Sequence, residues 1–140
     1  MNTKFKETVV EYLDCCNKHD ADRMKNILSE DFVFKTYSVN GNGKLAHVSS
    51  LEEYISGEKQ SYKTWINWSI EPQKWIIGED SIVLTIKQTS TFKETKKTRT
   101  GEDVMIFSFK GDKIKEICQY YEVTSVLNAM AKNTPNSEKK

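Results

Sequence analysis

Asp103 is the acidic side chain whose neighbours in the sequence most favour a role in acid–base catalysis. If the segment around it is a strand, Asp103 shares one face with Met105, Phe107 and Phe109. A carboxyl group among apolar side chains is poorly solvated, which raises its pKa and can fit it to act as a general base. At the end of a strand the same residue would instead lie in water as an ordinary surface acid. The sequence leaves both readings open.

Tyr12 and His47 are two further side chains able to donate hydrogen bonds. Tyr12 falls on the apolar stripe of a predicted N-terminal helix, where it is either a core residue or a donor facing a pocket. His47 follows a glycine-rich segment, in a predicted loop that we expect to be solvent-exposed. His19 is the only other histidine, so histidines alone cannot build an ordinary zinc site, and no metal is expected.

The tryptophans and cysteines are assigned to packing. Trp65 and Trp68 are separated by an odd number of residues, so on a regular strand they point to opposite faces. The three cysteines cannot all pair and show no Cys-x-x-Cys spacing, which favours reduced, packed thiols.

Composition excludes several classes of protein. The 140 residues carry a net charge of +1, which gives no general attraction for nucleic acid or anionic lipid. A basic turn at residues 93–99 is read as a solvated hairpin that blunts a sheet edge. Neither a signal peptide nor an apolar run long enough to span a bilayer is present, so the expected location is the cytoplasm. There is no Gly-x-Ser-x-Gly motif and no phosphate-binding glycine loop, and no cofactor is expected.

Two kinds of hydrophobic spacing predict the elements that must position these residues. Apolar residues recur at helical spacing through residues 3–18, and Asp20 can cap a second, short helix. Ser50 and Glu53 form a capping-box pattern for a third helix, which we expect to fray after Gly57. A loop is predicted at 40–44, strands at 32–38, 65–77, 82–87, 104–109 and 114–123, and a terminal helix at 123–130.

Helices that precede strands predict an α+β domain whose last four strands form an antiparallel meander. Pro72 interrupts one of these strands, so that strand must lie at a sheet edge or contain a bulge there. We expect one domain over residues 1–131 and a mobile tail over residues 132–140.

Four motifs occur in an order that resembles a known superfamily. They are Val-Glu-Tyr-Leu at 10–13 leading into Asn-Lys-His-Asp-Ala-Asp at 17–22, Leu-Ser-Glu-Asp-Phe-Val-Phe at 28–34, Phe-Ser-Phe-Lys-Gly-Asp-Lys-Ile-Lys-Glu-Ile at 107–117, and Gln-Tyr-Tyr-Glu at 119–122. Together they resemble the nuclear transport factor 2-like superfamily, which includes SnoaL-like polyketide cyclases and ketosteroid isomerases. The resemblance spans residues 4–126.

The resemblance implies a cone, in which a strongly curved antiparallel sheet wraps around three N-terminal helices. This architecture is also called the cystatin-like or nuclear transport factor 2-like roll. It implies a pocket at the open end and a homodimer formed through the outer face of the sheet.

The resemblance also implies roles for single residues. Tyr12 falls where ketosteroid isomerases have an oxyanion-hole tyrosine. Thr36 falls near their general-base aspartate, and Met105 near the protonated aspartate of their oxyanion hole. Because a threonine cannot remove a carbon-bound proton at neutral pH and both acids are missing, ketosteroid isomerase activity is not expected.

Glu122 lies near the acid that serves SnoaL-like cyclases in acid–base catalysis. Strict strand alternation places Glu122 on one face with Cys118 and Tyr120, and Gln119 and Tyr121 on the other. We favour Gln119 and Tyr121 as the pocket residues, although a bulge would reverse this choice.

Two functions therefore remain. The preferred one is a cytoplasmic pocket protein that binds a largely apolar, carbonyl-bearing molecule and, if it is an enzyme, acts by proton abstraction or by water addition and elimination. Its candidate catalytic residues are Asp103, Tyr12 and Glu122, and its candidate ligand-binding residues are Thr36, His47, Met105, Gln119 and Tyr121. The alternative is a non-catalytic, homodimeric binding or protein-interaction module. A cavity of roughly a few hundred Å³ with converging titratable groups would favour the enzyme, and a sealed core the module.

Overall fold

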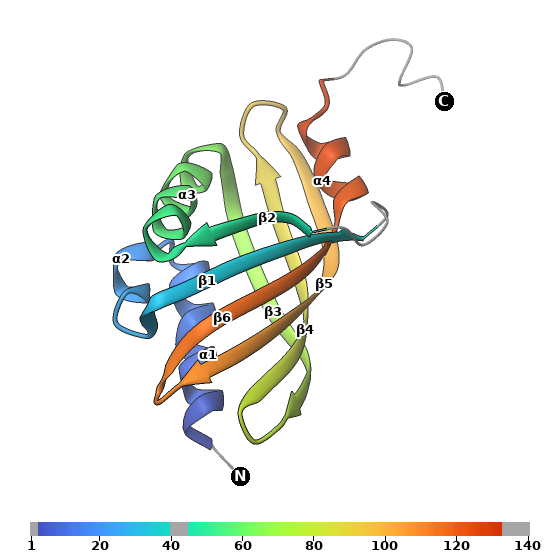
Figure 1. The fold of residues 1–140 in the computed structure, drawn as a ribbon. Coiled ribbons are helices and arrows are strands. Elements are labelled where there is room, and N and C mark those ends of the chain that lie inside the picture. The colour runs from blue at the N-terminus through green and yellow to red at the C-terminus, as the bar shows by residue number, and fades with distance from the viewer. Residues whose placement is uncertain (1–2, 40–44, 133–140) are drawn as a thin grey trace.

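The computed structural model describes residues 3–39 and 45–132, which form a single curved sheet with helices packed on it (Figure 1). The elements are α1 (Thr3–Asn17), α2 (Ala21–Met24), β1 (Leu28–Val39), β2 (Leu45–Ser50), α3 (Leu51–Thr64), β3 (Trp65–Ile77), β4 (Ser81–Phe92), β5 (Lys97–Lys110), β6 (Lys113–Glu122) and α4 (Val123–Met130). The predicted α+β class is confirmed. The loop expected at 40–44, and residues 133–140 of the tail expected at 132–140, lie outside the described residues.

The sheet has the strand order β2-β1-β6-β5-β4-β3. Each described pair of neighbours is antiparallel except β1 and β6, which are parallel, so the sheet is mixed rather than wholly antiparallel as expected. These two strands are separated by most of the chain, and no hairpin turn forces them to run in opposite directions. The short strand β2 was not predicted, and it places His47 in the sheet, opposite Thr36, instead of in a loop.

The core lies between α1 and the concave face of the sheet. As the periodicity predicts, one stripe of α1 is buried, and alternate residues of β4 face the same core. Phe5 of α1 stacks on Phe109 of β5 with ring centroids 3.9 Å apart. The cysteines of the described residues are free, and Cys15 and Cys16 are buried in this core as packed thiols.

Helix α3 begins as predicted but continues much further. Ser50 and Glu53 form the capping box, with N–H to side-chain oxygen distances of 3.0 and 3.3 Å. The helix passes through Gly57 and ends only at Thr64, which corrects the expected fraying. A glycine inside a helix costs about 1 kcal/mol relative to alanine. The strong cap and the burial of Tyr54 and Ile55 offset this cost.

Strand β3 lies at a sheet edge and contains two irregularities. The pairing register shifts between Pro72 and Lys74, as the proline required. A second shift falls between Ile66 and Ser69, where Asn67 has a φ of 57°. This bulge breaks the simple alternation on which the opposite orientation of the two tryptophans depended.

The hairpin between β4 and β5 is tighter than expected. The turn is confined to residues 93–96, with Lys96 at a φ of 61°, and β5 begins at Lys97. Arg99 therefore belongs to a strand and is only 4% exposed, which corrects its assignment to a solvated basic cluster.

Candidate functional site

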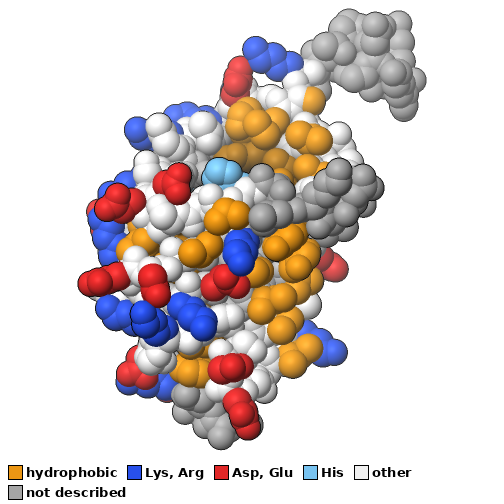
Figure 2. Space-filling view, in the orientation of Figure 1, with side chains coloured by type: hydrophobic (Ala, Val, Ile, Leu, Met, Phe, Trp, Pro, Cys, Tyr) orange, Lys and Arg blue, Asp and Glu red, His pale blue; other side chains and the backbone are white. Residues whose placement is uncertain are grey.

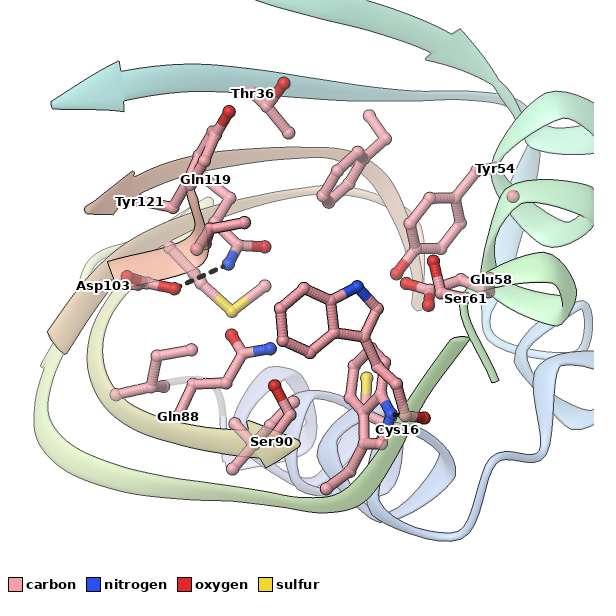
Figure 3. A pocket seen from close by; sticks show the side chains of 18 of the residues that line it. Cys16, Thr36, Tyr54, Glu58, Ser61, Gln88, Ser90, Asp103, Gln119 and Tyr121 are labelled. Atoms are coloured by element: carbon pink, nitrogen blue, oxygen red, sulfur yellow. Dashed lines mark hydrogen bonds between the residues drawn. The ribbon is translucent and has the colours of Figure 1, made fainter. Parts of the chain in front are cut away.

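A cavity of about 410 Å³ opens inside the curved sheet. Side chains from α1, α3, α4 and all six strands of the sheet line it, so only α2 among the described elements does not contribute. Figure 3 shows polar side chains gathered at two ends, with Asp103 and Gln119 at one and Tyr54 and Glu58 at the other. Apolar side chains, Trp68, Met105 and Ile86 among them, also line the cavity.

Most of the residues singled out in the sequence come together around this cavity. Those that line it are Tyr12, Thr36, His47, Asp103, Met105, Gln119 and Tyr121. Gln119 and Tyr121 thus lie on the inner face of β6, as strict alternation favoured.

Glu122 is not among the residues that line the cavity. It is the N-cap of α4, and its carboxylate accepts hydrogen bonds from the backbone N–H groups of Thr124 and Ser125, both at 2.7 Å. These backbone hydrogen bonds lower the pKa of Glu122 to about 2. A carboxylate held in this way stabilises a helix start and is a poor proton acceptor, so these contacts do not support the expected role of Glu122 in acid–base catalysis.

Asp103 is buried rather than at a solvated strand end, being 1% exposed. Its Oδ1 accepts from Arg99 Nη2 and from the Glu122 backbone N–H, both at 3.3 Å. Its Oδ2 accepts from Gln119 Nε2 at 3.1 Å (Figure 3). Three donors converge on one carboxylate, so Asp103 fixes the groups around it.

Arg99 completes this cluster and connects it to α4. Its Nε donates to Ser125 Oγ at 3.0 Å, and its Nη2 donates to the Glu122 carbonyl at 3.4 Å. Gly101 makes room for the guanidinium, because a Cβ at that position would come within 2.5 Å of Arg99 Nη2. Arg99 and Asp103 are four residues apart and share a strand face, a spacing that could have revealed the pair in the sequence.

Glu58 is the functional candidate that sequence reasoning missed. It lies on the part of α3 beyond Gly57, where the helix was expected to fray, and it lines the cavity with Tyr54 and Ser61. The spacing 54, 58, 61 is that of one helix face, so a longer predicted helix would have identified it. Desolvation raises the pKa of Glu58, and a hydrogen bond with Tyr54 partly opposes that shift.

The tyrosine hydroxyls beside Glu58 are hydrogen-bonded to each other, Tyr12 of α1 to Tyr54 of α3. Burial raises the pKa of both tyrosines well above the usual value, and it does the same for the neighbouring Cys16 thiol. These groups therefore stay protonated at neutral pH and can act as hydrogen-bond donors. No salt bridge to Glu58 is found within residues 3–39 and 45–132.

Trp65 and Trp68 both line the cavity, which corrects the expectation that only one could face inward. The bulge at Asn67 reorients the backbone between them, and Trp68 Nε1 donates to the Trp65 carbonyl at 2.7 Å. The bulge thus adds aromatic surface to the cavity wall.

The described part of the chain contains no group of three or more His, Cys, Asp and Glu side chains placed to hold a metal ion. Among the same residues, no helix is both long and apolar enough to cross a bilayer.

Comparisons with known proteins agree with the fold. The family model described as SnoaL-like domain matches residues 9–117. None of the curated protein sequences compared with the chain matches it.

Solved structures share the fold at low sequence identity. A Bacillus subtilis protein provisionally assigned as an isomerase has a TM-score of 0.77 and 17% identity, over 92% of this chain and 95% of that one. A Jannaschia protein provisionally assigned as a SnoaL-like polyketide cyclase has a TM-score of 0.75 and 13% identity, over 94% of both chains. An LEH-like epoxide hydrolase from M. tuberculosis has a TM-score of 0.72 and 9% identity, over 91% and 90%.

Proposed function

This chain belongs to the SnoaL-like domain family, and on that premise we propose that its cavity binds a small, largely apolar molecule with a carbonyl group and moves a proton on it. The observation that carries the proposal is the desolvated Glu58 carboxyl group beside the hydrogen-bonded hydroxyls of Tyr12 and Tyr54, at the end of the cavity opposite Asp103 and Gln119 (Figure 3).

Each of these groups suits one part of a proton abstraction next to a carbonyl. The ionised Glu58 takes the proton from the carbon beside the carbonyl, and the C–H electron pair forms the double bond of an enolate. One tyrosine hydroxyl donates to the other, and the hydroxyl that accepts donates its own proton to the oxygen on which negative charge develops. A raised pKa makes Glu58 a stronger base than a solvated carboxylate.

The enolate can then follow one of three courses. Glu58 can return the proton to another carbon, which is an isomerisation. The enolate can expel a leaving group from the adjacent carbon, which is an elimination, or attack a second carbonyl of the same molecule, which is a cyclisation. The class of reaction is therefore cofactor-independent acid–base chemistry, carried out by this chain's own side chains.

Asp103 is given a different role from Glu58 in this proposal. Its carboxylate accepts from Arg99, Gln119 and a backbone N–H group, so removing those contacts would be necessary before it could take a proton. We assign it to positioning, and we assign Thr36, His47, Met105, Gln119 and Tyr121 to the walls that contact the ligand.

The test is exchange of the acidic C–H protons of β-tetralone in D₂O, followed by mass spectrometry. We expect the wild-type protein to accelerate exchange over buffer, and Glu58→Gln to lower the rate by about 10²–10⁴-fold. Glu71→Gln, which changes an exposed carboxyl group on β3, is the matched control and should keep the wild-type rate. Exchange that is equally fast in Glu58→Gln would overturn the proposal and favour the non-catalytic binding module.

We also propose a homodimer formed through the outer face of the sheet. On that face Tyr37 of β1 stacks on Tyr120 of β6, with ring centroids 4.7 Å apart and planes 12° apart. Tyr120 pairs with Val104 of β5, and Ile106 lies two residues further along the same strand. Figure 2 shows hydrophobic side chains gathered over this part of the molecule and around α4. Light scattering should give a dimer mass for the wild type and a monomer mass for Ile106→Lys, and a monomeric wild type would contradict the proposal.

A further inference from the structure

The hydrogen bonds of Asp103 dictate which way the Gln119 amide points. Asp103 Oδ1 is used by Arg99 and the Glu122 backbone N–H, which leaves Oδ2 for Gln119. A carboxylate oxygen can only accept a hydrogen bond, so the amide nitrogen of Gln119 must face it. The amide direction is therefore set by a buried ion pair rather than by the ligand.

The consequence is that the Gln119 amide oxygen turns away from Asp103. Figure 3 shows the amide nitrogen directed at Asp103 and the oxygen directed into the cavity. An amide oxygen accepts hydrogen bonds and cannot donate them. Thr36, Gln88 and Tyr121 also line the cavity, but their hydroxyl and amide groups can both donate and accept, so they impose no such preference.

We propose that the ligand carries a hydrogen-bond donor, an N–H or a hydroxyl group, at the end that faces Gln119, and that Asp103 is the positioning residue that imposes this requirement. The position of the ligand's carbonyl group is taken from the proposed function, on which this inference rests. That function places the carbonyl at the opposite end of the cavity, beside Tyr12 and Tyr54. The substrate class is thus a compact apolar molecule with a carbonyl at one end and a donor at the other.

Replacement of Asp103 by asparagine should invert this preference. Arg99 and the Glu122 N–H still demand an acceptor, so the new amide keeps its oxygen toward them and places its nitrogen where Oδ2 was. That nitrogen donates to the Gln119 oxygen, which forces the Gln119 amide to rotate and present N–H to the cavity. A role that is only structural would weaken all ligands equally and would not reverse their order.

The experiment compares two isosteric tricyclic ketones by isothermal titration calorimetry. One, a tetrahydrocarbazolone, carries an indole N–H, and the other, the corresponding tetrahydrodibenzofuranone, carries an oxygen in the same place. We expect the wild type to bind the N–H ketone about tenfold more tightly, because the oxygen analogue places two acceptors against each other. Asp103→Asn should bind the oxygen analogue more tightly.

Gln119→Leu is the second variant, because it keeps the ion pair of Arg99 and Asp103 and removes the selecting amide. It should bind both ketones with equal affinity. The proposal is overturned if the wild type binds the two ketones equally, or binds neither ketone up to its solubility. It is also overturned if Gln119→Leu still binds the N–H ketone more tightly, or if Asp103→Asn weakens binding of both ketones without changing which one binds more tightly. This experiment measures binding and not exchange. If the wild type failed to accelerate β-tetralone exchange but still preferred the N–H ketone, the proposed proton transfer would be contradicted and the donor requirement would still be supported.

Discussion

Two of the carboxyl groups that line the cavity, those of Asp103 and Glu58, have different surroundings. Asp103 lies against the Arg99 guanidinium and accepts three hydrogen bonds. Glu58 has no such cation in the described structure and borders tyrosine hydroxyls and apolar side chains. A paired carboxylate holds its neighbours in place, whereas a desolvated one is ready to exchange a proton. The two ends of one cavity thereby acquire a positioning role and a chemical role.

Removal of the Arg99 guanidinium should have the largest effect on stability. Arg99→Met leaves the Asp103 carboxylate buried without its countercharge, which we expect to lower the free energy of unfolding by about 3–5 kcal/mol. The double change Arg99→Met with Asp103→Leu should recover most of that loss, because no charge remains buried.

Urea denaturation measures these changes. Lys93→Met, at an exposed position of the same hairpin, is the control and should change the free energy of unfolding by less than about 0.5 kcal/mol. If Arg99→Met costs no more than this control, the assignment of Asp103 as a strongly paired carboxylate is wrong.

Loss of one tyrosine hydroxyl tests the other end of the cavity. Tyr12→Phe removes a donor to the developing oxyanion, so the rate of β-tetralone exchange should fall by about 10²-fold. Tyr37→Phe, on the outer face of the sheet, should leave the rate unchanged. Equal rates in Tyr12→Phe and wild type would remove the tyrosine pair from the proposed chemistry.

The pH dependence of the free energy of unfolding should show whether the Glu58 carboxyl group is desolvated or behaves as a solvated surface acid. The folded protein raises the pKa of Glu58 above 4.5, so the folded state binds the proton more tightly than the unfolded state. Relative to Glu58→Gln, the wild type should therefore lose stability as the pH rises from 4.5 to the folded pKa, with no further change above it. Parallel pH profiles for the two proteins would show that Glu58 is solvated.

Glu122 should give the smallest effect, with the opposite sign. Its pKa falls from 4.5 to about 2 in the folded protein, so its stabilisation of α4 is complete above pH 4.5 and is lost as the pH falls toward 2. Glu122→Gln should lower the melting temperature slightly at neutral pH and remove this dependence. A melting temperature that falls equally with acid in both proteins would contradict the capping role.

Elements governed by local physics were predictable. The α1 stripe, the Asp20 cap of α2 and the capping box of α3 depend on residues three or four apart, and the structure contains all three. The even spacing of Gln119 and Tyr121 likewise gave the inner face of β6. Elements that depend on distant partners were not predictable in this way, namely strand β2, the parallel pairing of β1 with β6 and the length of α3 beyond Gly57.

By itself the sequence determined the α+β class, the superfamily resemblance and a set of candidate residues most of which line the cavity, because spacing along one helix or strand decides which side chains share a face. Only the tertiary structure decided what each carboxyl group can do. Asp103 contacts Arg99 on the same face of β5 and Gln119 on the neighbouring strand β6. Glu122 caps α4. Glu58 lies on the last part of α3, which continues beyond Gly57. Charge and proton affinity depend on those three-dimensional neighbours, which no single stretch of the chain contains.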